Sequence, residues 1–225
     1  MQDRFPYVQF IDKFFEARDE LRASVLKTAS DVFSMDMKNG TPITYSAPHL
    51  AKGVRHWMLW SGFAFGISRH LLIDQRDGTC LIPSRKTIHD AAKRSMFVVN
   101  PSSAARLVRF WFHFGADAAW PRYLVSPSEQ MQFKPDKNGI DAEATKRLIK
   151  EPLASSAADG LFVSHDGVKD GALRRFLFHI GQDGTVSVRD SRELIDSEAC
   201  ALLWEPMHEP IKELLFFGPA PGTRS

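Results

Sequence analysis

The chain has 225 residues, of which 44% are hydrophobic and 25% are charged, with 29 Lys and Arg against 27 Asp and Glu. This composition is that of a globular protein and excludes an intrinsically disordered chain. The longest apolar stretch, residues 57–67, is too short for a membrane-spanning helix of about 20 residues, and residues 1–6 lack the apolar core of a secretion signal, so we expect a cytoplasmic protein with no membrane partner.

The charge is distributed unevenly along the chain. Residues 50–125 hold 11 Lys and Arg against 4 Asp and Glu, whereas residues 1–49 and 126–225 each carry an excess of acidic residues. A basic segment of this kind is typical of a surface that contacts nucleic acid, a phosphorylated ligand or an acidic protein. We therefore expect the function to lie in the middle of the chain.

The first expected element is a long amphipathic helix over residues 7–34. Its apolar residues recur at spacings of three and four, and its polar residues alternate in charge. The apolar side packs either on the body of the protein or on a second copy of the same helix in a homodimer. A second helix, rich in tryptophan and phenylalanine, is predicted over residues 47–66.

Two Asp-Gly-Thr sequences, at 77–79 and 183–185, each separate two apolar segments. Asp-Gly favours the positive φ angles of a tight turn, so each sequence predicts a β-hairpin. The second hairpin has the clearer alternation of apolar and polar residues. Capping residues and helical spacing predict further helices over residues 85–93, 101–115, 141–150, 191–204 and 209–217.

The chain divides into three parts. Residues 1–125 form a helical part with a basic centre, residues 126–160 a polar linker, and residues 161–225 a small α+β part that is either separate or packed into a single domain with the rest. The predicted fold class is α+β, helix-rich in its N-terminal and central parts, with a C-terminal antiparallel β-hairpin packed by helices.

Residues 76–125 have the order of elements of a DNA-binding module. The loop at Asp77-Gly78, a short strand at 80–82, the helix start at Pro83-Ser84 and the helix at 101–115 resemble a winged-helix module, with 119–125 in the place of the wing strand. The resemblance covers about a fifth to a quarter of the chain, and the connection at 94–100 is longer than the usual turn of about three to four residues and contains no glycine. A plain hairpin followed by a helix is the alternative interpretation.

The winged-helix resemblance implies a set of residues that contact nucleic acid. At the first helix, a serine cap, backbone N–H groups and basic side chains would bind phosphate. On the second helix, serine and arginine side chains would face a groove, and one arginine on the wing would contact the backbone or the minor groove. The expected contact residues are Ser84, Arg85, Lys86, Lys93, Arg94, Ser102, Ser103, Arg106, Arg109 and Arg122.

We expect a nucleic-acid-binding protein, with duplex DNA as the ligand and a regulatory or replication-accessory role. One alternative is an interaction protein, such as an effector, an immunity protein or a mobile-element accessory factor, that binds an acidic protein partner. A second alternative is an enzyme that acts on a nucleotide or another phosphorylated ligand. The chain contains no nucleophile elbow, P-loop, dinucleotide fingerprint or zinc-protease motif, so we assign no catalytic residue.

The cysteines and histidines show no spacing typical of a metal site. Cys80 and Cys200 are far apart and belong to no Cys-X-X-Cys pair. His49 with His56, and His165 with its acidic neighbours, could seat a metal or a general base, but no third ligand is spaced to join either set. We therefore expect isolated histidines, no metal and no cofactor.

Overall fold

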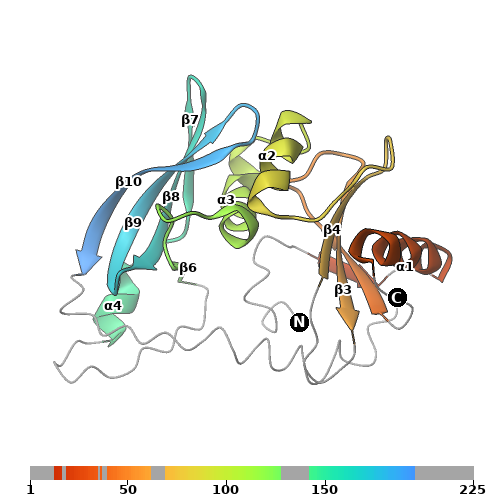
Figure 1. Ribbon diagram of the computed structural model, residues 1–225. Helices are drawn as coiled ribbons and strands as arrows, with labels where there is room; N and C mark the ends of the chain where they lie inside the picture. The colour runs from red at the N-terminus through yellow and green to blue at the C-terminus, as the bar shows by residue number, and fades with distance from the viewer. Residues whose placement is uncertain are drawn as a thin grey trace.

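The computed structural model describes residues 13–16, 19–34, 36, 40–61, 69–127 and 142–195. Two antiparallel sheets stand on either side of a pair of helices (Figure 1). Predictions for the start of the helix at 7–34, for Cys200 and for the helix at 209–217 lie outside the described residues.

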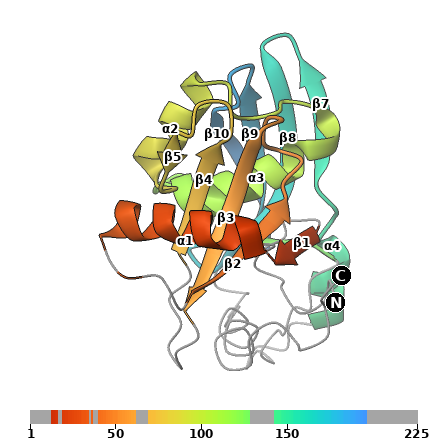
Figure 2. The ribbon, with the colours of Figure 1, turned by 90° about the vertical axis from the view of Figure 1, so that its right-hand side faces the viewer.

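The first sheet contains five strands in the order of the chain, each antiparallel to the next. Helix α1, Asp19–Phe33, lies across one face of this sheet (Figure 2). Val25 and Ala29 of the helix pack in one apolar cluster with Trp57 and Leu71 of the sheet. The strands are β1 Lys13–Glu16, β2 Gly40–Ser46, β3 Val54–Ser61, β4 Arg69–Asp74 and β5 Cys80–Leu81.

The second sheet comes from the C-terminal half of the described chain. Its strand order is β10-β9-β8-β6, and β7 pairs with another part of β8. Strand β10 lies at one end of this order, and its pairing with β9 contains two register shifts. The elements are β6 Tyr123–Val125, α4 Ala142–Leu148, β7 Leu153–Ala157, β8 Gly160–Lys169, β9 Ala172–Gly181 and β10 Val186–Ile195.

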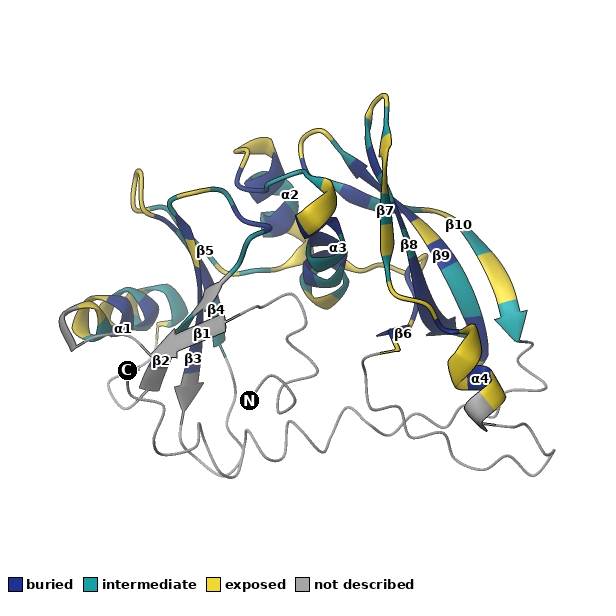
Figure 3. Cartoon of the chain, turned by 180° about the vertical axis from the view of Figure 1, so that it is seen from behind, coloured by how far each residue is buried: buried dark blue, intermediate teal, exposed yellow. Residues whose placement is uncertain are grey.

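Helices α2, Arg85–Lys93, and α3, Pro101–Gly115, join the two sheets. One apolar cluster contains Phe110 of α3 together with Leu72 of the first sheet and Phe176 of the second. Buried stretches of α2, α3, β8 and β9 gather in the middle of the molecule (Figure 3). The two sheets therefore share a core, and α3 is its central element.

The prediction of a helix-rich fold with a single C-terminal hairpin is wrong, because most of the described elements are strands of two sheets. The main cause is the helix expected over residues 47–66, where the described residues up to 61 contain strand β3 instead; residues 62–66 lie outside the described residues. Val54 packs in the central core, whereas Trp57 packs against α1 on the opposite face of the sheet. A strand that is buried on both faces loses the alternation of apolar and polar residues and cannot be distinguished from a buried helix by its pattern.

Other elements differ at their boundaries. Residues 13–16 are a strand, so the helix predicted over 7–34 begins at Asp19. Residues 191–195 continue strand β10, so the helix predicted from residue 191 is wrong there. Within the polar segment 126–160, the structure has the expected short helix, α4, and also strand β7.

Local signals in the middle of the chain are confirmed. Helices α2 and α3 have the predicted bounds, and both Asp-Gly-Thr sequences form turns in which Gly78 and Gly184 have φ angles of 72° and 84°. The arrangement of these elements differs from a winged helix. Strand β6, which stands in the place of the wing, pairs with β8 of the second sheet.

Candidate nucleic-acid interface

Ser84 caps α2, as predicted. Its Oγ accepts a hydrogen bond from the backbone N–H of Thr87 at 3.3 Å, and the Thr87 hydroxyl accepts one from the backbone N–H of Ser84 at 2.8 Å. This reciprocal capping box satisfies two backbone donors at the start of the helix within the protein itself. Next to the cap, Arg85 forms an ion pair with Asp117 at 3.0 Å, and Lys86 is exposed.

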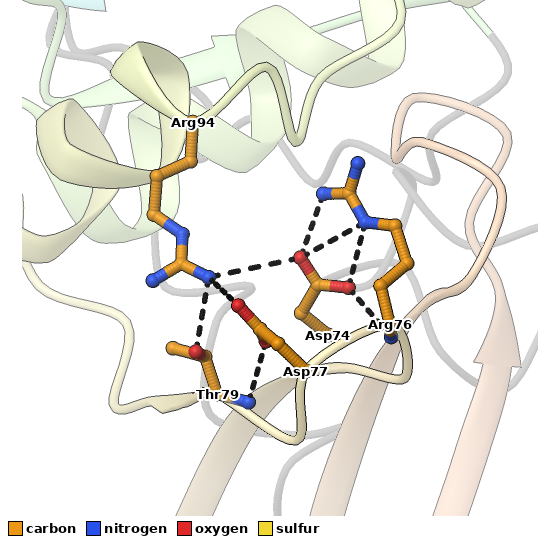
Figure 4. A network of polar contacts seen from close by, with 5 residues as sticks. All are labelled: Asp74, Arg76, Asp77, Thr79 and Arg94. Atoms are coloured by element: carbon orange, nitrogen blue, oxygen red, sulfur yellow. Dashed lines mark hydrogen bonds and ion pairs between the residues drawn. The ribbon is translucent and has the colours of Figure 1, made fainter.

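Arg94, at the other end of α2, belongs to a network with the β4–β5 turn (Figure 4). One of its terminal nitrogens lies 2.7 Å from the Asp77 carboxylate, donates to the Thr79 hydroxyl at 2.9 Å and lies 3.8 Å from buried Asp74. Arg76 donates to the same Asp74 carboxylate at 2.6 Å. Hydrogen bonds from Arg76 lower the pKa of Asp74 to about 2, because they stabilise the carboxylate. Arg94 thus holds the turn against the helix.

The acidic residues of the basic segment all form ion pairs. Residues 50–125 contain four, and each lies within ion-pair distance of a cation from the same segment. The pairs are Asp74 with Arg76, Asp77 with Arg94, Asp90 with Lys93 and Asp117 with Arg85. Among the expected contact residues, Arg85, Lys93 and Arg94 therefore have structural partners.

The two expected serines at the start of α3 differ in burial. Asn100 caps the helix, and its Oδ1 accepts hydrogen bonds from the Ser103 backbone N–H at 2.9 Å and from the Ser102 hydroxyl at 2.7 Å. Ser103 is buried, and its hydroxyl donates to the Val98 carbonyl at 3.2 Å. Ser103 thus stabilises the connection between the helices, whereas Ser102 is exposed.

Four polar residues of α3 lie on one side of the helix. Ser102, Arg106, Arg109 and His113 follow the spacing i, i+4, i+7, i+11, which aligns them along a single face. We call these four residues the α3 stripe. Ser102 and His113 are exposed, and the two arginines are half-buried. The structure thus brings together three of the expected contact residues, Ser102, Arg106 and Arg109.

Each arginine of the stripe has a buried histidine as an electrostatic neighbour. Burial and the positive charge of Arg106 lower the pKa of His49 to about 3. Burial and the charge of Arg109 hold the pKa of His165 well below its ordinary value. The Nδ1 of His165 lies 2.9 Å from the Asp166 carbonyl, which can only accept, so the neutral ring carries its proton on Nδ1. Its Nε2 has no hydrogen-bond partner among the described residues.

A pair of histidines on the first sheet faces the same helix. His56 Nε2 lies 3.0 Å from His70 Nδ1, and both rings pack against Phe114 of α3. Burial and the neighbouring imidazole hold the pKa of His56 well below its ordinary value, and burial, followed by the charge of His113, lowers that of His70 to about 3. Both rings are therefore neutral at pH 7.

The spacing of histidines along the sequence gave no indication of this arrangement. His56 and His70 come from neighbouring antiparallel strands in which Met58 is the partner of His70. Their contact depends on a register that becomes visible only once both strands are recognised. The described part of the chain contains no group of three His, Cys, Asp or Glu side chains that could hold a metal ion.

Arg122 lies apart from these residues. It precedes β6 and is exposed, and its guanidinium stands 5.4 Å from the centroid of the Tyr123 ring. Its backbone N–H donates to the Val168 carbonyl of β8 at 2.7 Å. The structure therefore assigns Arg122 to the second sheet.

Comparison of the chain with protein-family models, with curated proteins and with solved structures finds no match. No helix within the described residues is long and apolar enough to cross a membrane.

Proposed function

We propose that the protein binds single-stranded nucleic acid through the α3 stripe. The observation that carries the proposal is the alignment of Ser102, Arg106 and Arg109 on one face of α3, in the most basic segment of the chain. Guanidinium groups bind phosphate oxygens with two hydrogen bonds, and serine hydroxyls are common phosphate donors.

The position of α3 favours a single strand over a duplex. A helix that reads the major groove protrudes from its domain so that its side chains reach the base edges. Here α3 lies between two sheets, and Arg106 and Arg109 are half-buried (Figure 1). A flexible single strand can bring its phosphates to recessed side chains, whereas a rigid duplex cannot bend into such a position without a large cost in free energy.

Fluorescence anisotropy with a labelled single strand and a labelled duplex, each titrated over a range of salt, tests the proposal. We expect tighter binding of the single strand, with an affinity that falls steeply as salt rises, because phosphate contacts release counterions. Replacing Arg106 and Arg109 together by Ala removes two such contacts and should reduce the slope of log affinity against log salt by about 1.4. Absence of binding at low salt contradicts the proposal.

Two controls separate ligand contact from loss of fold. Arg192→Ala removes one exposed charge from β10 and should leave the salt slope unchanged. Arg106→Lys with Arg109→Lys keeps the charge and should preserve most of the slope while losing affinity that depends on the planar guanidinium. If Arg192→Ala weakens binding as much as the double alanine variant, the binding is a non-specific attraction to net charge and the assignment to α3 is wrong.

A further inference from the structure

A cavity of about 360 Å³ lies between the α3–β6 loop and the β8–β9 turn. Its lining includes Trp120, Arg122 and Tyr123 from the first segment and Lys169 and Asp170 from the second. Binding sites for small ligands typically enclose about 300–1,000 Å³, with mostly apolar walls and a few polar groups that orient the ligand. This cavity is at the lower end of that range.

The aromatic walls of the cavity are fixed to the core. Trp120 is 5% exposed. The centroid of its ring lies 4.9 Å from that of Phe178 of β9 and 6.4 Å from that of Phe112 of α3. Tyr123 pairs with Val168 across β6 and β8. The walls are therefore already in place before a ligand binds, which lowers the entropic cost of binding.

The two cations of the cavity are held in different ways. Lys169 donates from its ammonium to the carbonyls of Ala118 and Ala119, at 2.7 and 3.2 Å, and so ties the loop to the turn. The Arg122 guanidinium lies 5.4 Å from the Tyr123 ring centroid, which is the geometry of a cation–π contact. Of the two acidic residues in the lining, Asp117 is paired with Arg85. The other, Asp170, follows Lys169 in the β8–β9 turn, so the two acidic residues balance the two cations and Arg122 is the cation next to the aromatic wall.

We propose that this cavity binds one nucleotide unit of a single strand. The base stacks on the face of the Arg122 guanidinium that points away from Tyr123, which extends the existing contact into a stack of three planes. The phosphate accepts hydrogen bonds from the edge of Arg122 and from the Lys169 ammonium. Stacking on guanidinium planes and aromatic rings is a common way in which proteins bind unpaired bases. The inference rests on the proposed function, since it assumes the same class of ligand.

Isothermal titration calorimetry with adenosine 5′-monophosphate, adenosine and inorganic phosphate tests the cavity. The monophosphate should bind more tightly than either of its parts, because it alone contacts both the stack and the cations. Arg122→Ala should lower its affinity roughly fivefold to a hundredfold, the range expected for loss of one stacked base. Arg192→Ala removes a cation from β10 that does not line the cavity, and it should leave the affinity unchanged. Equal affinity for inorganic phosphate and the monophosphate overturns the stacking assignment, and no binding of the monophosphate overturns the proposal.

The same variants distinguish failure of this inference from failure of the proposed function. The variant with Arg106→Ala and Arg109→Ala should lose oligonucleotide binding but retain the monophosphate, since neither residue lines the cavity. If the protein binds oligonucleotides with the expected salt slope but does not bind the monophosphate, the proposed function is supported and the proposal that the cavity binds a nucleotide unit is wrong. A protein that binds the monophosphate but no oligonucleotide contradicts the proposed function and overturns the assignment of the cavity to a strand.

Discussion

Helices α2 and α3 carry much of the positive charge of the basic segment, yet they are held in different ways. The charged residues of α2 lie at the surface, where Arg85, Lys93 and Arg94 each have a carboxylate partner. Helix α3 is fixed by apolar burial, and its two arginines lie beside neutral histidines. A count of charges along the sequence therefore does not show which cations form ion pairs with carboxylates and which have buried histidines as neighbours.

Acidification should cause the largest loss of stability, through the buried histidines around α3. His49, His56 and His70 are neutral in the folded protein, with pKa values lowered from 6.5 to about 3 for His49 and His70 and well below 6.5 for His56. The unfolded chain binds protons first, so stability is complete above about pH 6.5 and falls as the pH drops toward about 3. Each such histidine contributes roughly 1.4 kcal/mol per pH unit to this loss while it is protonated in the unfolded chain and neutral in the folded protein.

Urea denaturation between pH 7 and pH 4.5 measures this loss. Replacing His70 by Asn should reduce the slope of stability against pH, since it removes one of five histidines whose pKa is lowered in the folded protein. A free energy of unfolding that stays constant between pH 6.5 and pH 4.5 would contradict the neutral state of these rings.

Removal of the buried carboxylate at the β4–β5 turn should have the next largest effect. Asp74→Asn leaves Arg76 and Arg94 without their shared partner, and loss of a hydrogen bond to a charged group costs about 1–3 kcal/mol. The effect should be read at pH 7 by urea denaturation. The pKa of Asp74 is lowered from 3.8 to about 2, so its contribution is present above pH 3.8 and disappears as the pH falls toward 2. This pH range lies mostly below the range in which the histidines titrate. The contacts that hold α2 and those around α3 should therefore weaken at different pH values.

Arg85→Ala should have the smallest effect. The side chains of Arg85 and Asp117 are 60% and 36% exposed, and ion pairs at such positions contribute about 0–1 kcal/mol. Thermal unfolding of this variant should differ little from that of the native chain. Its oligonucleotide affinity should also exceed that of the variant with Arg106→Ala and Arg109→Ala. If Arg85→Ala reduces the affinity more than the double variant does, the interface lies on α2 and its assignment to α3 is wrong.

Local chemistry was readable from the sequence, whereas pairing between distant segments was not. The Ser84 cap and the Asp77-Gly78 turn depend on a few neighbouring residues, and both are present. Strand β3 was misread because its two faces are both buried, which removes the alternation that identifies a strand. The pairing of Tyr123 with Val168 joins residues 45 positions apart, and no pattern within either segment specifies its partner.

Only part of the candidate interface could be predicted from the sequence, again because local patterns are readable and contacts between distant segments are not. The α3 stripe follows from helical periodicity once α3 is recognised, so Ser102, Arg106 and Arg109 could be named in advance. The burial of Ser103 depends on where the preceding connection, with Val98, passes beside the helix. The neighbours of the stripe come from different sheets, because His49 follows β2 of the first sheet and His165 lies in β8 of the second, so their positions depend on the two-sheet architecture.

Strand β10, at the end of the second sheet, also bears on how the protein behaves at high concentration. A strand edge with unpaired backbone groups is a template on which another chain can add a strand, and this is a common start of aggregation. In β10, four exposed charged residues and the two register shifts interrupt such a template. These residues are Arg189, Asp190, Arg192 and Glu193. The edge therefore resists addition of a further strand, which disfavours edge-to-edge aggregation of this sheet-rich protein.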